Sequence, residues 1–216
     1  MYKVDLHTHS TASHDGGINE EQYMRLLDDG VLDFVAITDH DTIEFAESLH
    51  RTLGSKIIVG EEITTRDGEI IGLFLSETIK PGMSAKDTMY AIRKQKGIVY
   101  VPHPFETLRK GLQRPVLDEF ADLINIVEVY NGRAVIQNRG PEAAVWARLN
   151  HKVSTACSDA HGIKGVGTAY TVVNKKPNRH NLVSLLEIGH MTMHRPPLHS
   201  LLYPKANKIR QVLRRK

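Results

Sequence analysis

Short hydrophobic, β-branched runs alternate along the chain with longer segments of helical periodicity. The runs predict eight strands, at Lys3–His7, Phe34–Thr38, Lys56–Val59, Ile70–Leu75, Ile98–Val101, Asn125–Tyr130, Val153–Ala156 and Ala169–Val173. The periodic segments predict six helices, at Asn19–Asp29, Thr42–Leu53, Ser84–Gln95, Val116–Leu123, Pro141–Leu149 and Asn178–Ile188. This repeating strand–helix order implies a parallel sheet, either doubly wound or closed into a barrel.

Two local patterns add detail to this picture. The Arg-Asp-Gly-Glu segment Arg66–Glu69 lies between two predicted strands and is typical of a hairpin turn, so it predicts a local antiparallel pair. Trp146 and Met24 fall on apolar helix faces and are expected in the core.

The composition is that of an ordinary globular domain. Among 216 residues, 41% are hydrophobic and 25% are charged, which excludes collagen-like and disordered chains. No apolar run approaches the roughly 18 residues of a membrane span, so no membrane partner is expected. The first residues lack the pattern of a secretory signal, and the single cysteine, Cys157, excludes an intramolecular disulfide. We therefore expect a cytoplasmic protein, of unknown oligomeric state.

Histidines and carboxylates recur directly after the predicted strands. His7 and His9 are two positions apart at the end of the first strand, so strand alternation places both on one face. Six successive strands each deliver a His, Asp or Glu, in the segments Val4–Ser10, Thr38–Asp41, Gly60–Ile63, Val101–Pro104, Val127–Asn131 and Cys157–His161. Any one of these residues is explained by a buried or capping role, but coincidence at six strand ends is a poor explanation.

The carboxyl-terminal edge of a parallel sheet or barrel is where active sites lie. Imidazole and carboxylate ligands without thiolates suit Zn, Mn or Fe, and so many ligands suit more than one ion. The sequence thus predicts a site for two or three divalent metal ions per chain.

The same segments, in their order, resemble the motifs of the PHP (polymerase and histidinol phosphatase) family. They are His7-Thr8-His9-Ser10, Thr38-Asp39-His40-Asp41, Gly60–Ile63, His103-Pro104 and Ser158-Asp159-Ala160-His161. The resemblance extends from residue 3 to about Thr171. It implies a distorted (β/α)7 TIM-like barrel whose trinuclear metal site hydrolyses phosphoesters.

The resemblance also implies a ligand set, which we carry over by position. His7, His9 and Asp159 would bind one ion, and Glu62 would bridge two ions, with Glu61 as a structural neighbour. Asp15, His40 and His161 would bind the second ion, and His103 the third. Where some members supply a further histidine for the third ion, this chain offers Glu128 and Asn131.

The chemistry follows from these ligands. Two divalent ions bridged by a hydroxide would generate a nucleophile at neutral pH and hold phosphate oxygens for attack. Arg133 is the best candidate to clamp the phosphate, because a guanidinium binds phosphate oxygens in pairs. Arg139, Lys164 and Arg109 are weaker candidates for substrate binding. Asp39 is expected to orient a ligand imidazole.

Three functions remain open at this point. The leading hypothesis is a metal-dependent phosphoesterase that acts on a small phosphorylated metabolite or a nucleotide. A nuclease acting on nucleic acid or an oligonucleotide is the alternative, supported by the basic loop Arg109–Arg114 and the basic C-terminal segment. A non-catalytic, metal-stabilised binding module is the third.

The domain boundaries are predicted at residues 1–200 for the phosphoesterase domain and 201–216 for a basic tail or helix. The last part of the chain, Pro204–Lys216, carries six Lys or Arg residues and no acid. Ile209, Val212 and Leu213 form an apolar stripe there, which favours a terminal helix, either solvated or packed, over a nucleic-acid arm.

Overall fold

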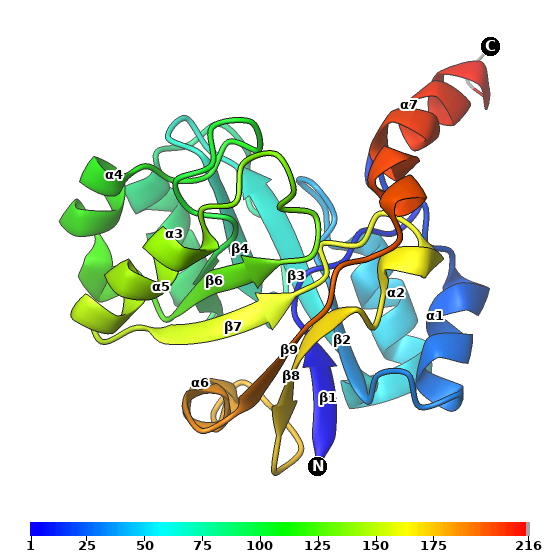
Figure 1. The fold of residues 1–216 in the computed structure, drawn as a ribbon, viewed down its shortest axis with the longest axis horizontal. Helices are drawn as coiled ribbons and strands as arrows, with labels where there is room; N and C mark the ends of the chain where they lie inside the picture. Colours follow the sequence, from blue (N-terminus) through cyan, green and yellow to red (C-terminus); the bar gives the residue numbers. More distant parts are fainter. Residues whose placement is uncertain (215–216) are drawn as a thin grey trace.

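The computed structural model describes residues 1–214 and contains one mixed sheet with helices around it (Figure 1). Its strands are β1 (Tyr2–Asp5), β2 (Phe34–Ile37), β3 (Ile57–Thr64), β4 (Glu69–Leu73), β5 (Ile98–Val101), β6 (Ile126–Asn131), β7 (Val153–Cys157), β8 (Ala169–Val173) and β9 (His190–Met193). Its α-helices are α1 (Glu20–Asp28), α2 (Glu44–Leu53), α3 (Ala85–Lys94), α4 (Arg114–Glu119), α5 (Gly140–Leu149), α6 (Leu182–Glu187) and α7 (Tyr203–Arg214). Four short 3-10 segments complete it, at Gly54–Lys56, Ala121–Leu123, Ile163–Gly165 and Leu198–Leu202.

The eight predicted strands and six predicted helices are all present. Their ends differ by a few residues, and the largest difference among the strands is in β3, which continues from Val59 to Thr64 because it pairs with β4. The hairpin predicted at Arg66–Glu69 is confirmed, since β3 and β4 are antiparallel neighbours on either side of it. β9 was not predicted as a strand.

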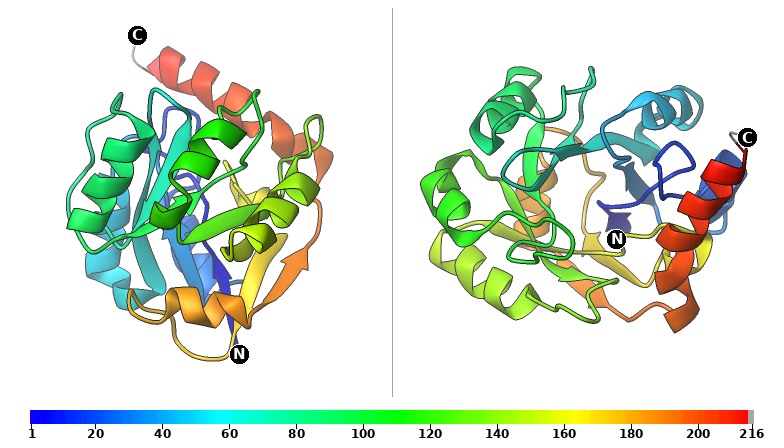
Figure 2. Two further views of the ribbon diagram at one scale, coloured as in Figure 1. Left: turned by 90° about the vertical axis from the view of Figure 1, so that its left-hand side faces the viewer. Right: turned by 90° about the horizontal axis from the view of Figure 1, so that it is seen from above.

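The sheet order is β7-β6-β5-β4-β3-β2-β1-β8-β9, and the sheet curves into a nearly closed barrel with helices outside (Figure 2). At the seam, the hydroxyls of Thr155 in β7 and Thr171 in β8 are hydrogen-bonded at 2.9 Å. Beyond β1, the His9 amide donates to the carbonyl of Ala160 at 2.9 Å, which joins the segment after β1 to the segment after the edge strand β7. The distorted TIM-like barrel is therefore confirmed.

The strands of this distorted barrel do not all run in the same direction. The sheet has nine strands within residues 1–214, and β4 and β8 run antiparallel to both of their neighbours. The six strands β1, β2, β3, β5, β6 and β7 all run in one direction. Their carboxyl ends consequently share one rim of the barrel.

Side chains on the two faces of the strands form two hydrophobic layers. In β2, Val35 and Ile37 face the outer helices, whereas Phe34 and Ala36 face the barrel interior. Leucines of α6 pack into the inner layer and close the lower end of the barrel (Figure 2). Trp146 is buried as predicted, but Met24 is only half-buried because Tyr23 occupies the core position in α1.

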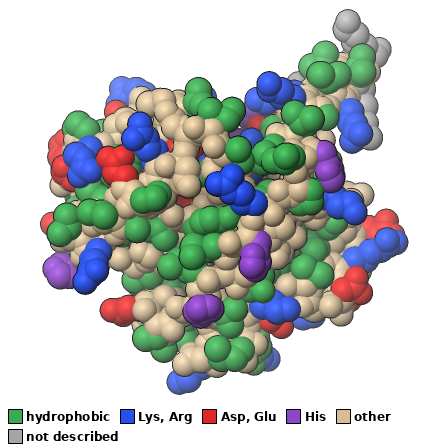
Figure 3. All heavy atoms as spheres, viewed as in Figure 1, with side chains coloured by type: hydrophobic (Ala, Val, Ile, Leu, Met, Phe, Trp, Pro, Cys, Tyr) green, Lys and Arg blue, Asp and Glu red, His purple; other side chains and the backbone are tan. Residues whose placement is uncertain are grey.

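The C-terminal segment forms α7, which projects from the body and exposes apolar and basic side chains (Figure 3). The predicted terminal helix is present, and its apolar stripe is solvated rather than packed: Ile209, Val212 and Leu213 are each more than half exposed, whereas Pro204 and Asn207 are buried. Arg215 and Lys216, part of the predicted basic tail, lie outside the described residues. Between Met1 and Arg214, every helix is too short or too polar to cross a membrane.

Candidate metal centre

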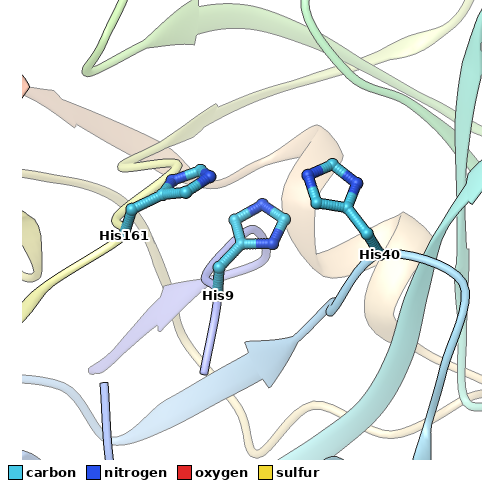
Figure 4. Close-up of side chains that lie close together, drawn as sticks. All are labelled: His9, His40 and His161. Atoms are coloured by element: carbon cyan, nitrogen blue, oxygen red, sulfur yellow. The ribbon is translucent and has the colours of Figure 1, made fainter. Parts of the chain in front are cut away.

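Imidazole and carboxylate side chains meet at the barrel rim where the six parallel strands end. Histidines at the ends of three different strands approach one another: His9 after β1, His40 after β2 and His161 after β7 (Figure 4). The centroid of the His9 ring lies 4.7 Å from the centroid of the His40 ring and 4.2 Å from that of the His161 ring. Residues about 150 positions apart in the chain thus form one cluster.

Glu62, on β3, lies at the centre of this cluster. Its Oε2 atom is 3.2 Å from Nε2 of His9 and 3.4 Å from both Nε2 of His7 and Nδ1 of His40. Its Oε1 atom is 3.1 Å from Nε2 of His103. One buried carboxylate with an imidazole on each side has the geometry of a bridging ligand.

Two aspartates occupy the side of the cluster opposite His103. Asp159 Oδ1 lies 3.5 Å from Nε2 of His9 and 3.4 Å from Nδ1 of His161. Asp15 Oδ1 lies 3.4 Å from Nε2 of His161 and 3.6 Å from Nε2 of His40. The structure therefore brings together eight of the nine residues that the sequence singled out as ligands: His7, His9, Asp15, His40, Glu62, His103, Asp159 and His161.

The ninth residue, Glu128, lies behind His7 rather than in the cavity. Its carboxylate lies 3.0 Å from Nδ1 of His7 and accepts hydrogen bonds from the hydroxyl of Tyr100, from Asn131 Nδ2 and from the amide of His103. These contacts occupy both oxygens. In this position Glu128 supports the His7 ring from behind, and its role as a direct metal ligand stays a prediction.

Glu69 takes a place at the rim that sequence reasoning missed. It is buried where β4 begins, and its Oε2 lies 3.8 Å from Nε2 of His103. Burial and the neighbouring charge of Glu62 raise the pKa of Glu69 to about 9. In the sequence Glu69 falls in the predicted hairpin turn, away from the six strand ends, so no pattern there marks it as a ligand.

The carboxylates create a strongly negative field inside the cluster. Burial alone would lower the pKa of His7 and of His9, yet the neighbouring Asp159 and Glu62 raise the pKa of His7 well above its usual value and that of His9 to about 9. Burial lowers the pKa of His40 to about 4 and, together with Arg133, that of His161 to about 3. The cluster thus stabilises added positive charge and holds two imidazoles neutral, as metal ligands must be.

Unpartnered buried atoms test whether divalent ions fit this cluster. Among the described residues, five buried side-chain atoms lack a hydrogen-bond partner, and three belong to it: Asp15 Oδ1, His40 Nδ1 and His103 Nδ1. Such orphans are costly in a folded protein unless another group satisfies them. Asp15 Oδ1 and the surrounding nitrogen and oxygen donors match what Zn, Mn or Fe binds, so the residues fit divalent metal ions.

A cavity of about 410 Å³ opens above the cluster. Arg133 lines it and donates to Nδ1 of His161 at 3.1 Å, with Asp159 Oδ1 at 3.3 Å. Arg109 also lines it, and its guanidinium bonds to Asp159 at 2.7 Å and to Glu106. Both guanidiniums are half-buried and fixed beside the proposed ligands.

The other two predicted substrate cations lie elsewhere. Arg139 precedes α5, where it forms an exposed ion pair with Glu142 at 3.6 Å, and Lys164 is exposed in a 3-10 turn. Neither lines the cavity. The sequence placed both near the strand ends, but the loops that carry them turn outward.

Asp39 has a different partner from the predicted one. Its carboxylate accepts hydrogen bonds from the amide and the hydroxyl of Ser10, at 2.7 and 2.5 Å. Asp5 does the same for Ser158, with its Oδ2 2.5 Å from the Ser158 hydroxyl. These two buried aspartates fix the loops that follow His9 and precede Asp159. The Asp39 carboxylate is also hydrogen-bonded to Ser13, whose Oγ lies 3.1 Å from Nδ1 of His9, so Asp39 reaches that imidazole through a serine rather than directly.

Known proteins that resemble this chain point to one family. The PHP-associated family model matches residues 138–189. An uncharacterised protein of Methanocaldococcus jannaschii is 31% identical over 149 residues, which cover 63% of this chain and 87% of that protein. A second uncharacterised protein of the same organism is 33% identical over 172 residues, covering 78% of this chain and 69% of the relative.

Two crystal structures share the fold. One is a two-domain protein from Bacteroides vulgatus that contains a predicted PHP-like metal-dependent phosphoesterase, with a TM-score of 0.71, 20% identity, and coverage of 96% of this chain and 69% of that one. The other is PsfC from Pseudomonas syringae, with a TM-score of 0.67, 16% identity and 98% coverage of both chains. With the ordered histidine and carboxylate motifs at the barrel rim and the matched PHP-associated segment, these relationships show that the chain belongs to the PHP family.

Proposed function

We propose that this protein is a metal-dependent phosphoesterase that hydrolyses the phosphate ester of a small metabolite or nucleotide. The observation that supports this most is the position of Glu62, whose two oxygens lie within 3.4 Å of nitrogens of four different histidines. A carboxylate in that position is suited to hold two divalent ions side by side. When bound, such ions supply an activated water at neutral pH and neutralise charge on the phosphate.

The side chains divide the work of holding the ions. His7, His9 and Asp159 would hold one ion, and Asp15, His40 and His161 a second, with Glu62 between them. His103 and Glu69 would hold a third. Glu128 keeps the His7 ring in place, and Asp5 and Asp39 keep the adjoining loops in place through Ser158 and Ser10.

The chain also supplies fixed positive charge for the phosphate. Arg133 is held by His161 and Asp159, so its remaining N–H groups reach the cavity without a further loss of side-chain entropy. Arg109 is held in a similar way by Asp159 and Glu106. Preorganised donors of this kind stabilise the charge that develops on the transferring phosphoryl group.

The size of the cavity favours a small substrate. A volume of about 410 Å³ is in the range of pockets for small molecules and accommodates one nucleotide or a phosphorylated metabolite. The loop Arg109–Arg114, which supported a nuclease, directs Arg109 into the cavity rather than outward as part of a flat basic surface.

The test is phosphate release from a panel of esters with added Mn²⁺ and with a chelator. The panel contains a nucleoside 3′,5′-bisphosphate, a mononucleotide, histidinol phosphate and a short oligonucleotide. We expect chelator-sensitive release from at least one of the three small esters. Cleavage of the oligonucleotide alone would favour the nuclease. No phosphate release from any ester by folded, metal-loaded protein would favour a binding module.

A pair of variants separates this activity from a contaminating phosphatase. Asp159→Asn should abolish release, because Asp159 contacts His9, His161 and both cavity arginines. Asp122→Asn makes the same change at an exposed position in a 3-10 turn and should keep the wild-type rate.

A further inference from the structure

The C-terminal helix α7 is fixed against the loops of the metal centre. Asn207 is buried, and its Nδ2 donates to the backbone carbonyls of both Asp15 and His161 at 2.9 Å. The ring of Tyr203 packs on Gly162, where a Cβ atom would lie 2.7 Å from the ring. The first turns of α7 therefore hold a defined position at the barrel rim (Figure 2).

This docking brings two lysines to the cavity. Lys205 and Lys208 are three positions apart on α7, so they share one face of the helix, and both line the cavity. Nζ of Lys208 lies 3.8 Å from Asp15 Oδ2. Lys110, from the loop after β5, is a third lysine on the same cavity, and all three side chains are exposed.

The cations thus form two levels. Arg109 and Arg133 lie at the inner level, in ion pairs with Asp159 at 2.7 and 3.3 Å. Lys110, Lys205 and Lys208 lie at the mouth. The inner guanidiniums are sufficient to bind one phosphate beside the ligand cluster, so the outer ammoniums have no role in holding that group.

The charges that line the cavity also favour the binding of a second anionic group. Five cationic side chains and four carboxyl groups, those of Asp15, Glu62, Glu69 and Asp159, line it, so the lysines and arginines outnumber the acidic groups. Each divalent ion would add two positive charges. A phosphate monoester carries at most two negative charges, and a loaded cavity would therefore still favour a further anion.

The geometry points to an anion-binding subsite at the cavity mouth, formed by Lys205 and Lys208 of α7 with Lys110, which takes a second anionic group of the substrate. The inference rests on the proposed function and narrows it: the preferred substrate is a phosphoester that carries another phosphate or a carboxylate. A phosphoester of the same size that has no second anionic group uses the inner level alone.

Binding of phosphonates to the metal-loaded protein tests this without turnover. Propylphosphonate carries one anionic group, and ω-carboxyalkylphosphonates of increasing chain length carry a second. Calorimetry should show that at least one carboxylated probe binds about tenfold more tightly than propylphosphonate, as expected for contacts with two or three exposed ammoniums. In the double variant Lys205→Ala/Lys208→Ala this advantage should fall to about twofold or less, with the affinity for propylphosphonate unchanged.

Arg210→Ala is the matched control, because Arg210 is an exposed cation on the same helix that does not line the cavity. It should keep the tenfold preference. Equal binding of all probes to the wild-type protein, or an equal loss of preference in Arg210→Ala, would overturn the subsite. If propylphosphonate itself does not bind in a metal-dependent way, the proposed function fails, which is a different result from equal binding of the probes.

Discussion

Glu61 and Glu62 are adjacent in β3 and have opposite environments. Glu62 Oε2 lies 3.2 Å from Nε2 of His9, at the centre of the ligand cluster. Glu61 Oε2 instead accepts the backbone N–H of Ile79 at 2.9 Å, on the other face of the sheet, and its Oε1 has no hydrogen-bond partner. Strand alternation separates the two carboxylates by a sheet even though they are neighbours in the chain.

This relationship gives a first prediction. Glu62→Gln should lower kcat/KM for a phosphoester by about 1,000-fold or more, because an amide cannot replace a bridging carboxylate. Glu61→Gln, the same change one residue away, should bind metal normally and keep activity within about threefold. Kinetics together with metal analysis of both variants measures this, and equal losses would contradict the assignment of Glu62.

The second prediction concerns stability and pH. Burial raises the pKa of Glu61 from 4.5 to about 7. The folded state therefore holds this proton more tightly than the unfolded state. The contribution of Glu61 to stability is full below pH 4.5 and is lost as the pH rises through about 7, by on the order of 3 kcal/mol.

Glu61→Gln should remove this dependence of the free energy of unfolding on pH. Urea unfolding of wild type and variant at several pH values between about 5 and 8 measures the difference between the two curves. Their free energies of unfolding should diverge between about pH 5 and 7 and differ by a constant amount above that range. Parallel curves would show that the Glu61 carboxyl titrates normally.

The third prediction concerns the residue behind His7. Glu128→Gln keeps the size of the side chain but weakens the contact with His7 Nδ1, so metal affinity should fall by about 10- to 100-fold. Excess metal should restore most of the activity, since every proposed ligand remains. Metal titration followed by calorimetry measures the affinity, with Glu119→Gln, an exposed position on α4, as the control. Loss of activity that excess metal does not restore would instead favour Glu128 as a direct ligand.

The fourth prediction separates Arg133 from Arg139, the weaker of these two candidates for substrate binding. Arg133→Ala should lower kcat/KM by about 10- to 100-fold, because it removes a fixed charged donor from the cavity. Arg139→Ala should have no effect beyond about twofold, because Arg139 pairs with Glu142 outside the cavity. A comparable loss in both variants would contradict the positions of these side chains.

The sequence was sufficient for the fold and for most of the ligand cluster for a physical reason. Segments that follow parallel strands all lie on one rim, so strand order placed the segments of His7, Asp159 and Glu62 together, and the family resemblance singled out these residues within them. The ninth strand was harder to predict from the sequence. β9 is short and half exposed, and its residues lack the hydrophobic run that marks a buried strand.

Side-chain roles that depend on contacts between distant segments could not be predicted from the sequence. The role of Glu128 depends on Tyr100 and Asn131 occupying its oxygens, which no local pattern reveals. Asn207 reaches the carbonyl of Asp15 across 192 positions of the chain. The way α7 docks could likewise not be predicted, because the helix packs through Tyr203, Pro204 and Asn207 rather than through its apolar stripe.

The most direct test of the account is a titration of metal-free protein with Mn²⁺ in which bound metal and phosphate release are followed in the same samples. The account predicts no turnover without metal, and turnover that rises as two or more ions bind per chain. Full turnover by metal-free protein, or binding of metal without any turnover of a phosphoester, would contradict it.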